Sequence, residues 1–182
     1  MFRKYMDEVW QISSTLSDET VAHSLAIIDK FAKANNRIFV AGNGGSAAIA
    51  SHFVTDLVKI GYVRGSAIRA HSLVDNISLF SATANDFGFE NSFSWQLSQV
   101  ASADDLLIVI SSSGNSENII NVLKTAKQIG TFSISLTGFD GGAASKLSDL
   151  AIITPSEVGS YGPVEDLHAI FCHCISRELR KV

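Results

Sequence analysis

Residues 40–53 read VAGNGGSAAIASHF, an apolar stretch followed by a glycine-asparagine turn and then by small residues at helical spacing. Gly42, Gly44 and Gly45 allow the backbone to adopt positive φ angles and to approach a ligand closely. Ser46 begins the expected helix, whose free N–H groups and dipole favour negative charge. The stretch predicts a strand, a turn and a helix that could cradle a phosphate or a carboxylate. A plain turn between strand and helix would also use glycine, so both interpretations stay open.

Apolar runs and helical patterns alternate along the rest of the chain. Runs such as Leu106–Ile110 (LLIVI) are continuously apolar, as parallel strands covered on both faces require. The alternation favours βαβ crossovers and predicts an α/β fold, a three-layer α/β/α sandwich. We expect strands at 37–41, 66–73, 105–110, 132–137 and 150–154, and helices near 46–60, 75–84, 117–129, 143–148 and 164–180.

The first 35 residues predict a pair of helices. They divide at Ser17-Asp18, where Ser17 is suited to be an N-cap, and an apolar stripe follows through Val21, Leu25 and Ile28. The helical pair (1–35) and the α/β sandwich (36–182) are expected to form a single domain over 1–182. A length of 182 residues, with 46% hydrophobic and 18% charged residues, suits one compact core.

Charge and cysteine usage exclude several classes of function. The formal net charge of −4 removes the broad positive field that nonspecific nucleic-acid binding needs. The N-terminus is charged and no apolar run reaches membrane-spanning length, so neither a signal peptide nor a membrane anchor is expected. Cys172 and Cys174 point to different faces of the last expected helix, so no disulfide framework is encoded. A reducing cytoplasm is the expected location.

A second segment repeats the design of the first. Residues 108–118 read IVISSSGNSEN, in which a strand ends in Ser111, Ser112 and Ser113, turns at a glycine and enters a helix through Ser116. These hydroxyls and a helix N-terminus could surround one anion without any Lys or Arg. An ordinary serine-capped loop explains one serine better than four, so the sequence favours an anion site.

Polar residues on two helices are candidates for the chemistry. His52 and Asp56 are four residues apart and share one helix face, where they could bind a metal or transfer a proton. A lone histidine on an apolar helix is more often a core residue, so this pair needs support. The last helix offers it through Glu165 and His168, with His173 turned away from their stripe.

Taken in order, the motifs resemble a known family. GNGGS, SHF, NDFGF (85–89), SSSGNS, LTGFDGG (136–142) and VEDLH closely resemble the SIS (sugar isomerase) domains and, within them, the phosphoheptose isomerases, over nearly the whole chain. The resemblance implies a five-stranded parallel sheet between helices, N-terminal helices used in oligomerisation, and a homotetramer with active sites at subunit interfaces. It also implies a sugar-phosphate substrate, with no nucleic acid and no membrane as partner.

The resemblance assigns roles to individual residues. The phosphate is expected at Gly44, Gly45, Ser46, Ser111, Ser113 and Ser116, with Ser112 contributing mainly through its backbone. Asn43 and Asp86 are expected sugar-hydroxyl contacts, although Asn43 could serve only the turn and Asp86 could only cap a helix. Zn²⁺ is expected at His52, Asp56, Glu165 and His173, a set of two imidazoles and two carboxylates that suits this ion. The family pattern has Glu where this chain has Asp56, and Gln where it has Glu165.

The implied reaction is an aldose–ketose interconversion through an enediol, as in sedoheptulose 7-phosphate to D-glycero-D-manno-heptose 7-phosphate. Asp56 is expected as the base and His173 as the acid, with Zn²⁺ or local hydrogen-bond donors as electrophile. A carboxylate engaged with a metal is a poor base, so Glu165 stays an alternative base.

Two other functions remain to be weighed at this point. One is a non-enzymatic SIS tetramer that binds proteins, as the replication-initiator-associated relatives do. The presence of Asp56 and His173 counts against it. The other is a sugar-phosphate-sensing regulatory domain, which is the weakest because no DNA-binding domain accompanies it.

Overall fold

The computed structural model describes residues 1–181, and its chain begins with two helices. These are α1 (Phe2–Ser13) and α2 (Asp18–Lys33). Ser17 is the N-cap of α2, and its side chain accepts the N–H of Thr20 at 3.1 Å. The predicted helical pair and its division at Ser17 are therefore confirmed.

A parallel sheet of five strands forms the middle layer, in the order β2-β1-β3-β4-β5. The chain runs from β1 outward to β2 and then returns to place β3 on the other side of β1. The carboxyl ends of β1 and β3 therefore form a topological switch point, where α/β sheets bind ligands. The strands are β1 (Arg37–Gly42), β2 (Arg69–Ser72), β3 (Leu106–Ser111), β4 (Phe132–Phe139) and β5 (Leu150–Pro155).

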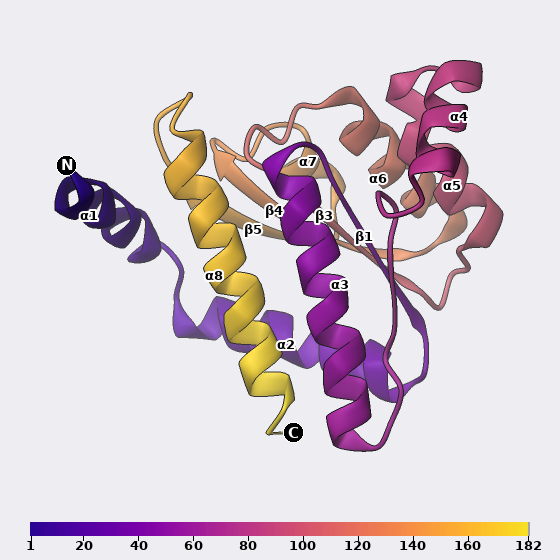
Figure 1. Ribbon diagram of the computed structural model, residues 1–182, viewed down its shortest axis with the longest axis horizontal. Coiled ribbons are helices and arrows are strands. Elements are labelled where there is room, and N and C mark those ends of the chain that lie inside the picture. Colours follow the sequence, from indigo (N-terminus) through magenta and orange to yellow (C-terminus); the bar gives the residue numbers. More distant parts are fainter. Residues whose placement is uncertain (182) are drawn as a thin grey trace.

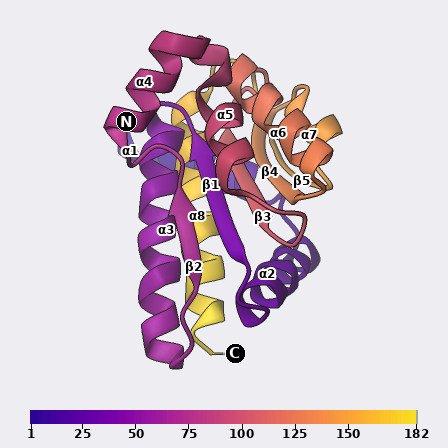
Figure 2. The same ribbon diagram turned by 90° about the vertical axis from the view of Figure 1, so that its right-hand side faces the viewer.

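Helices cover both faces of the sheet, as Figures 1 and 2 show. One apolar core joins α2, α3 and α8 to the sheet, and a second joins α5, α6 and α7 to the other face. The predicted three-layer sandwich with a five-stranded parallel sheet is confirmed. The remaining helices are α3 (Gly45–Arg64), α4 (Ile77–Phe87), the 3-10 turn η1 (Phe89–Asn91), α5 (Ser92–Val100), α6 (Glu117–Ile129), α7 (Ala144–Leu147) and α8 (Tyr161–Leu179).

Helices α3 and α8 lie side by side on their face of the sheet (Figure 1). Their apolar residues pack onto the strands, with Phe53 and Leu57 of α3 and Ile175 of α8 almost completely buried. Both helices begin at the carboxyl edge of the sheet and extend away from it in the same direction, so their polar faces lie next to each other. None of the helices within 1–181 combines the length and the apolar character needed to cross a bilayer.

The largest differences between the structure and the sequence prediction are at β2 and α5. The predicted strand 66–73 is shorter, because residues 66–68 run against α3, where a β-carbon on Gly61 would lie 2.5 Å from the backbone nitrogen of Ile68. Helix α5 was not predicted. Its pattern is obscured by buried polar residues such as Gln96, whose amide donates to the carbonyls of Leu73 at 3.2 Å and Ser92 at 2.7 Å.

Candidate active site

Three helices begin around one pocket at the carboxyl edge of the sheet. They are α3, α6 and α8. The free N–H groups at a helix start carry partial positive charge, so three starts together favour an anion. The pocket has a volume of about 140 Å³ and is lined by Asn43, Ser46, Ser111, Ser112, Ser113, Ser116, Tyr161 and Glu165. The structure thus brings the serines of both predicted loops to one place, which we call the serine pocket.

The hydroxyls of the serine pocket keep protons available for a ligand. Ser111 Oγ accepts the N–H of Gly114 at 3.1 Å, and Ser113 Oγ accepts that of Asn115 at 3.2 Å. A hydroxyl that accepts in this way can still donate its own proton to an anion. These backbone bonds also fix where each oxygen lies, so the hydroxyls are ordered before a ligand arrives.

Ser112, expected to contribute mainly through its backbone, also lines the serine pocket. Its carbonyl accepts the N–H of Gly138 at 2.9 Å, which ties the loop to β4. Its Oγ is buried and has no hydrogen-bond partner within residues 1–181. Leaving a buried hydroxyl without a hydrogen bond costs free energy. The unpaired Ser112 hydroxyl therefore indicates that a bound ligand supplies the missing partner. The residues that line the serine pocket include no Lys or Arg within 1–181, so hydroxyls and helix starts supply its positive potential.

The glycines of the first loop serve two different needs. Gly44 has a φ of +54°, which an L side chain rarely adopts. A β-carbon on Gly42 would lie 2.6 Å from the carbonyl oxygen of Ser46, so the first turn of α3 needs glycine there. Gly45 faces the carboxylate of Glu165, which would collide with a β-carbon. Positive φ is thus needed only at Gly44, and close approach explains the other two.

The end of β4 and the loop after it, which contain the motif 136–142 (LTGFDGG), support the second serine loop together with the residues that follow. The backbone N–H of Ala144 donates to the carbonyl of Gly114 at 2.9 Å, and that of Ala143 donates to Asn115 Oδ1 at 3.0 Å. Gly114 itself has a φ of +62°. Within 1–181, no residue of the LTGFDGG motif lines the serine pocket. The motif therefore affects the pocket indirectly, by supporting the second serine loop.

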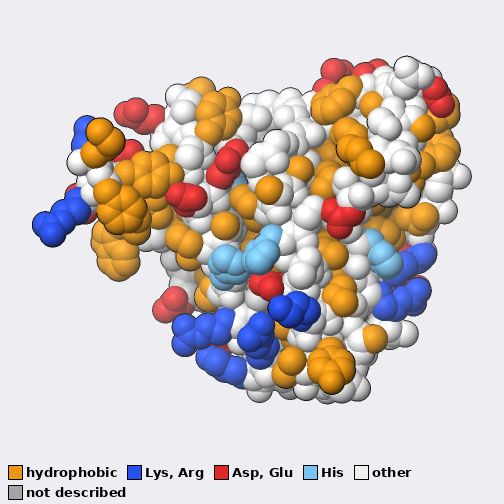
Figure 3. Space-filling view, in the orientation of Figure 1, with side chains coloured by type: hydrophobic (Ala, Val, Ile, Leu, Met, Phe, Trp, Pro, Cys, Tyr) orange, Lys and Arg blue, Asp and Glu red, His pale blue; other side chains and the backbone are white. Residues whose placement is uncertain are grey.

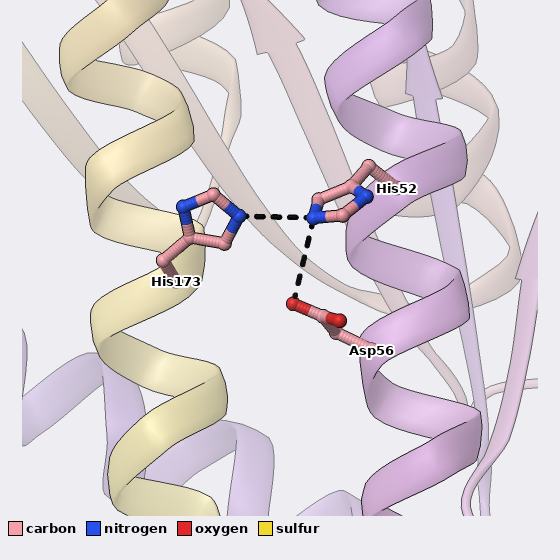
Figure 4. A group of neighbouring side chains, drawn as sticks. All are labelled: His52, Asp56 and His173. Atoms are coloured by element: carbon pink, nitrogen blue, oxygen red, sulfur yellow. Dashed lines mark hydrogen bonds and ion pairs between the residues drawn. The ribbon is translucent and has the colours of Figure 1, made fainter.

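His52, Asp56 and His173 come together on the facing surfaces of α3 and α8 (Figure 4). The Nε2 atoms of the two histidines are 2.9 Å apart, and Asp56 Oδ2 lies 3.8 Å from His52 Nε2. Each residue can direct one ligand atom to a common point, because these atoms all lie within 4.8 Å of one another. Both histidines are exposed, and pale blue side chains mark this part of the surface in Figure 3. The group could hold a metal ion.

Glu165, the fourth expected ligand, lies apart from this group. It is eight residues from His173 on α8, which is about 12 Å along a helix axis. Its carboxylate lines the serine pocket and lies against Gly45. The structure therefore brings together three of the four residues, and a role for Glu165 as metal ligand stays a prediction.

Asp86 is also away from the serine pocket in this chain. It is exposed in the last turn of α4, and its Oδ1 accepts the Nδ2–H of Asn85 at 2.9 Å. The N-cap of that helix is Asn76, so Asp86 does not cap its start. Its predicted contact with a sugar hydroxyl stays a prediction.

Two residues of the site were not anticipated. Tyr161 lines the serine pocket at the start of α8, and its ring packs edge-on against Phe139 with centroids 5.2 Å apart. Asn118 exchanges two hydrogen bonds with Asn43, at 2.8 and 2.9 Å. Neither residue stands out in the sequence, because each depends on a contact between distant segments.

His168, expected on one stripe with Glu165, is buried between α8 and the sheet, and so is Cys172. Burial lowers the pKa of His168 to about 4. Burial, together with the nearby Asp56 carboxylate, raises the pKa of the Cys172 thiol. A neutral imidazole and a neutral thiol in these positions belong to the core.

Comparisons with known proteins agree on one family. Residues 2–138 match the model of the SIS domain family. The phosphoheptose isomerase of Aliarcobacter butzleri strain RM4018 is 34% identical over 174 residues, covering 96% of this chain and 90% of the relative. The structure of phosphoheptose isomerase from Neisseria gonorrhoeae superposes with a TM-score of 0.90 at 27% identity, covering 100% of this chain and 95% of that one. The enzyme from Francisella tularensis gives a TM-score of 0.91 at 25% identity, with the same coverage.

Proposed function

Because the chain belongs to the SIS domain family and, within it, to the phosphoheptose isomerases, we propose that it interconverts sedoheptulose 7-phosphate and D-glycero-D-manno-heptose 7-phosphate. One observation supports this most directly: the serine pocket and the group His52, Asp56 and His173 lie along the same pair of helices. Ser46 and His52 are six residues apart on α3, which is about 9 Å along the helix. An extended seven-carbon sugar phosphate is of comparable length.

The phosphate end of the substrate binds in the serine pocket. Hydroxyls of Ser46, Ser111, Ser113 and Ser116 donate to its oxygens, together with the free N–H groups of three helix starts. Ser112 Oγ gains there the hydrogen-bond partner that it lacks within residues 1–181. With its phosphate held in the serine pocket, the substrate extends its carbonyl end along α3 toward His52. The carbonyl end is then held beside the groups that transfer protons, which makes these transfers faster.

The residues His52, Asp56 and His173 fit Zn²⁺. Two imidazoles and a carboxylate are a ligand set of catalytic zinc sites, in which three protein ligands leave one position open. The two Nε2 atoms, 2.9 Å apart, are close to the separation of roughly 3.3 Å between two nitrogens on one tetrahedral Zn²⁺. When bound, the ion would act as a Lewis acid that polarises the carbonyl of the sugar.

Asp56 acts as the base and His173 as the acid. Starting from the ketose, Asp56 takes a proton from C1 while His173 donates one to the oxygen on C2, which gives the enediol. His173 can donate this proton only from a ring nitrogen that is not bound to the ion, because a metal-bound nitrogen carries no proton. Asp56 then returns its proton to C2, and the hydroxyl on C1 gives its proton back to His173, which gives the aldose. Asp56 lies beside the histidines, whereas Glu165 lines the phosphate end, so the geometry favours Asp56 as base. A carboxylate has two oxygens, so one can remain free to take the proton.

The enzyme assembles as a homotetramer in this proposal. Large apolar side chains are exposed on α1 and on the outer half of α3, as a subunit interface requires. The two non-enzymatic alternatives are less well supported. A protein-binding scaffold or a sensor needs no group such as His52, Asp56 and His173. The relatives described above are all named as isomerases.

The direct test is a panel of ketose phosphates assayed with and without Zn²⁺. We expect turnover of sedoheptulose 7-phosphate that falls on chelation and returns with Zn²⁺. The variant His173→Ala should lose turnover while keeping its mass and folded state, because the acid is removed without any change in the core. His23 is an exposed histidine on α2, so His23→Ala is the matched control and should keep full activity. Undiminished turnover in His173→Ala would exclude the assigned acid.

A further inference from the structure

Two asparagines from distant segments form a closed pair beside the serine pocket. Asn43 lies in the loop between β1 and α3, and Asn118 lies in the first turn of α6, 75 residues further along the chain. Asn43 Nδ2 donates to Asn118 Oδ1 at 2.8 Å, and Asn118 Nδ2 donates to Asn43 Oδ1 at 2.9 Å. Both distances are those of good N–H···O hydrogen bonds.

Asn118 has no access to water that could replace this pairing. Its exposed fraction is 0%, and the only further polar contact of its side chain within residues 1–181 is a long one of 3.5 Å to Ser92 Oγ. Breaking the pair would therefore leave a buried amide unsatisfied, which costs more than one ordinary hydrogen bond. Asn43 is only half-buried and lines the serine pocket. The pair uses one N–H and one lone pair of its amide, and the others remain for a ligand.

The asparagine pair joins the loop after β1 to the loop after β3, just beyond the point where the two strands stop pairing. The register of β1 with β3 ends at Gly42 opposite Ile110. Past that point, within 1–181, the only side-chain hydrogen bonds between segment 43–46 and segment 111–118 are the two of the asparagine pair. Ser46 belongs to the first loop and the other pocket serines to the second, so one phosphate can reach both sets only if the loops keep a fixed separation.

We propose that Asn118 is a positioning residue for the substrate phosphate. It does not line the serine pocket within 1–181 and acts through Asn43, which it holds in place. The pair sets the distance between the two anion-binding loops, so that the hydroxyls of both meet the same phosphate. This inference rests on the proposed function, because it assigns the serine pocket to a phosphate.

The first test measures binding of inorganic phosphate by calorimetry and kinetics on the heptose phosphate. We expect Asn118→Ala to weaken phosphate binding by about tenfold, as the loss of a buried hydrogen-bonded partner predicts. KM should rise by a similar factor while kcat changes less, because the phosphate is held alike in the ground state and the transition state. Asn118→Ser, which keeps a small polar group, serves if the alanine variant does not fold.

Asn121 provides a matched control on the same helix. Its Nδ2 donates to the carbonyl of Glu90 at 3.0 Å, so Asn121→Ala also removes a hydrogen bond made by α6. That bond reaches η1 and not the anion-binding loops. We expect this variant to keep the phosphate Kd and the KM within about twofold of the wild-type values, whatever it does to melting temperature.

A double-mutant cycle then tests whether Asn118 works through Asn43. Once Asn43→Ala has removed the partner, Asn118→Ala should add little, so the effects on phosphate Kd should be strongly non-additive. Additive effects, or a folded Asn118→Ala with wild-type Kd and KM, would overturn the proposal. A wild-type protein that bound phosphate but did not isomerise heptose phosphate would overturn the proposed function and leave the role of the pair intact.

Discussion

Glu165 places a carboxylate in the wall of a pocket whose other side chains are hydroxyls, an amide and a phenol. A negative charge beside a bound phosphate repels it, most strongly where water is excluded. The carboxylate reaches this wall because Gly45, against which it lies, has no side chain. The resemblance to the phosphoheptose isomerases implies a neutral glutamine at this position, so this chain carries a charge that phosphate binding does not need.

We therefore expect Glu165→Gln to lower KM several-fold, because the change removes the like charge and keeps the shape. Zn²⁺ content should be unchanged, because His52, Asp56 and His173 come together without Glu165 in a group that could hold the ion. Steady-state kinetics and metal analysis of the same preparation give both values. If the variant instead lost its Zn²⁺, Glu165 would be the fourth ligand that the sequence predicts, and its side chain would have to turn toward His173.

Helix α8 packs on β4 and β5 through a buried polar layer as well as apolar side chains. His168 is 1% exposed, and its Nε2 lies 3.5 Å from Thr154 Oγ1. That hydroxyl donates to the carbonyl of Thr137 at 3.0 Å, so it can accept from the imidazole. Burial lowers the pKa of His168 to about 4, although the Thr137 carbonyl acts in the opposite direction.

This layer predicts how stability changes with pH. Between the ordinary histidine pKa of 6.5 and the folded value of about 4, the unfolded chain binds a proton that the folded chain does not. Stability is therefore full above pH 6.5 and falls as pH decreases toward 4, by up to about 3 kcal/mol from this residue. Urea unfolding of wild type and His168→Leu from pH 7.5 to 4.5 tests it. The wild-type curve should fall more steeply, and parallel curves would contradict the assignment.

The sequence predicted the elements whose ends carry local signals. The predicted range 117–129 for α6 agrees with the structure, because Ser116 precedes it and Gly130, with a φ of +89°, ends it. Helix α5 escaped prediction because its buried polar residues are satisfied by other segments. Gln96, for example, donates to the carbonyl of Leu73, 23 residues away. A local pattern contains no information about such a contact.

The same distinction separates the predicted and unpredicted parts of the site. The serines were predicted because each loop follows a strand, and parallel strands end at one edge of the sheet. His52, Asp56 and His173 meet because α3 and α8 both start at that edge and lie side by side. The direction of Glu165 and the pairing of Asn118 depend on contacts between distant segments, so the sequence could not provide them.

At the scale of the whole molecule, α1 presents apolar side chains that nothing within residues 1–181 covers. Phe2, Met6 and Trp10 are spaced four residues apart on one helix face, and Trp10 is 77% exposed. The other side of α1 packs on the body through Val9 and through Tyr5, which donates to Asp166 at 2.6 Å. Figure 3 shows orange side chains gathered where α1 projects. Such a patch is typical of a subunit interface.

We expect the wild type to form a tetramer of the 19.5 kDa chain and Trp10→Lys to form smaller species, because the change places a charge in the apolar interface. Light scattering coupled to size exclusion measures the mass, and activity should fall with it if the active sites are completed at subunit interfaces. Lys4→Glu, on the same helix, exchanges one exposed charge for another and should leave the mass unchanged. A Trp10→Lys protein with the wild-type mass would show that α1 does not hold the assembly together, and the interface would have to be sought on the exposed apolar residues of α3.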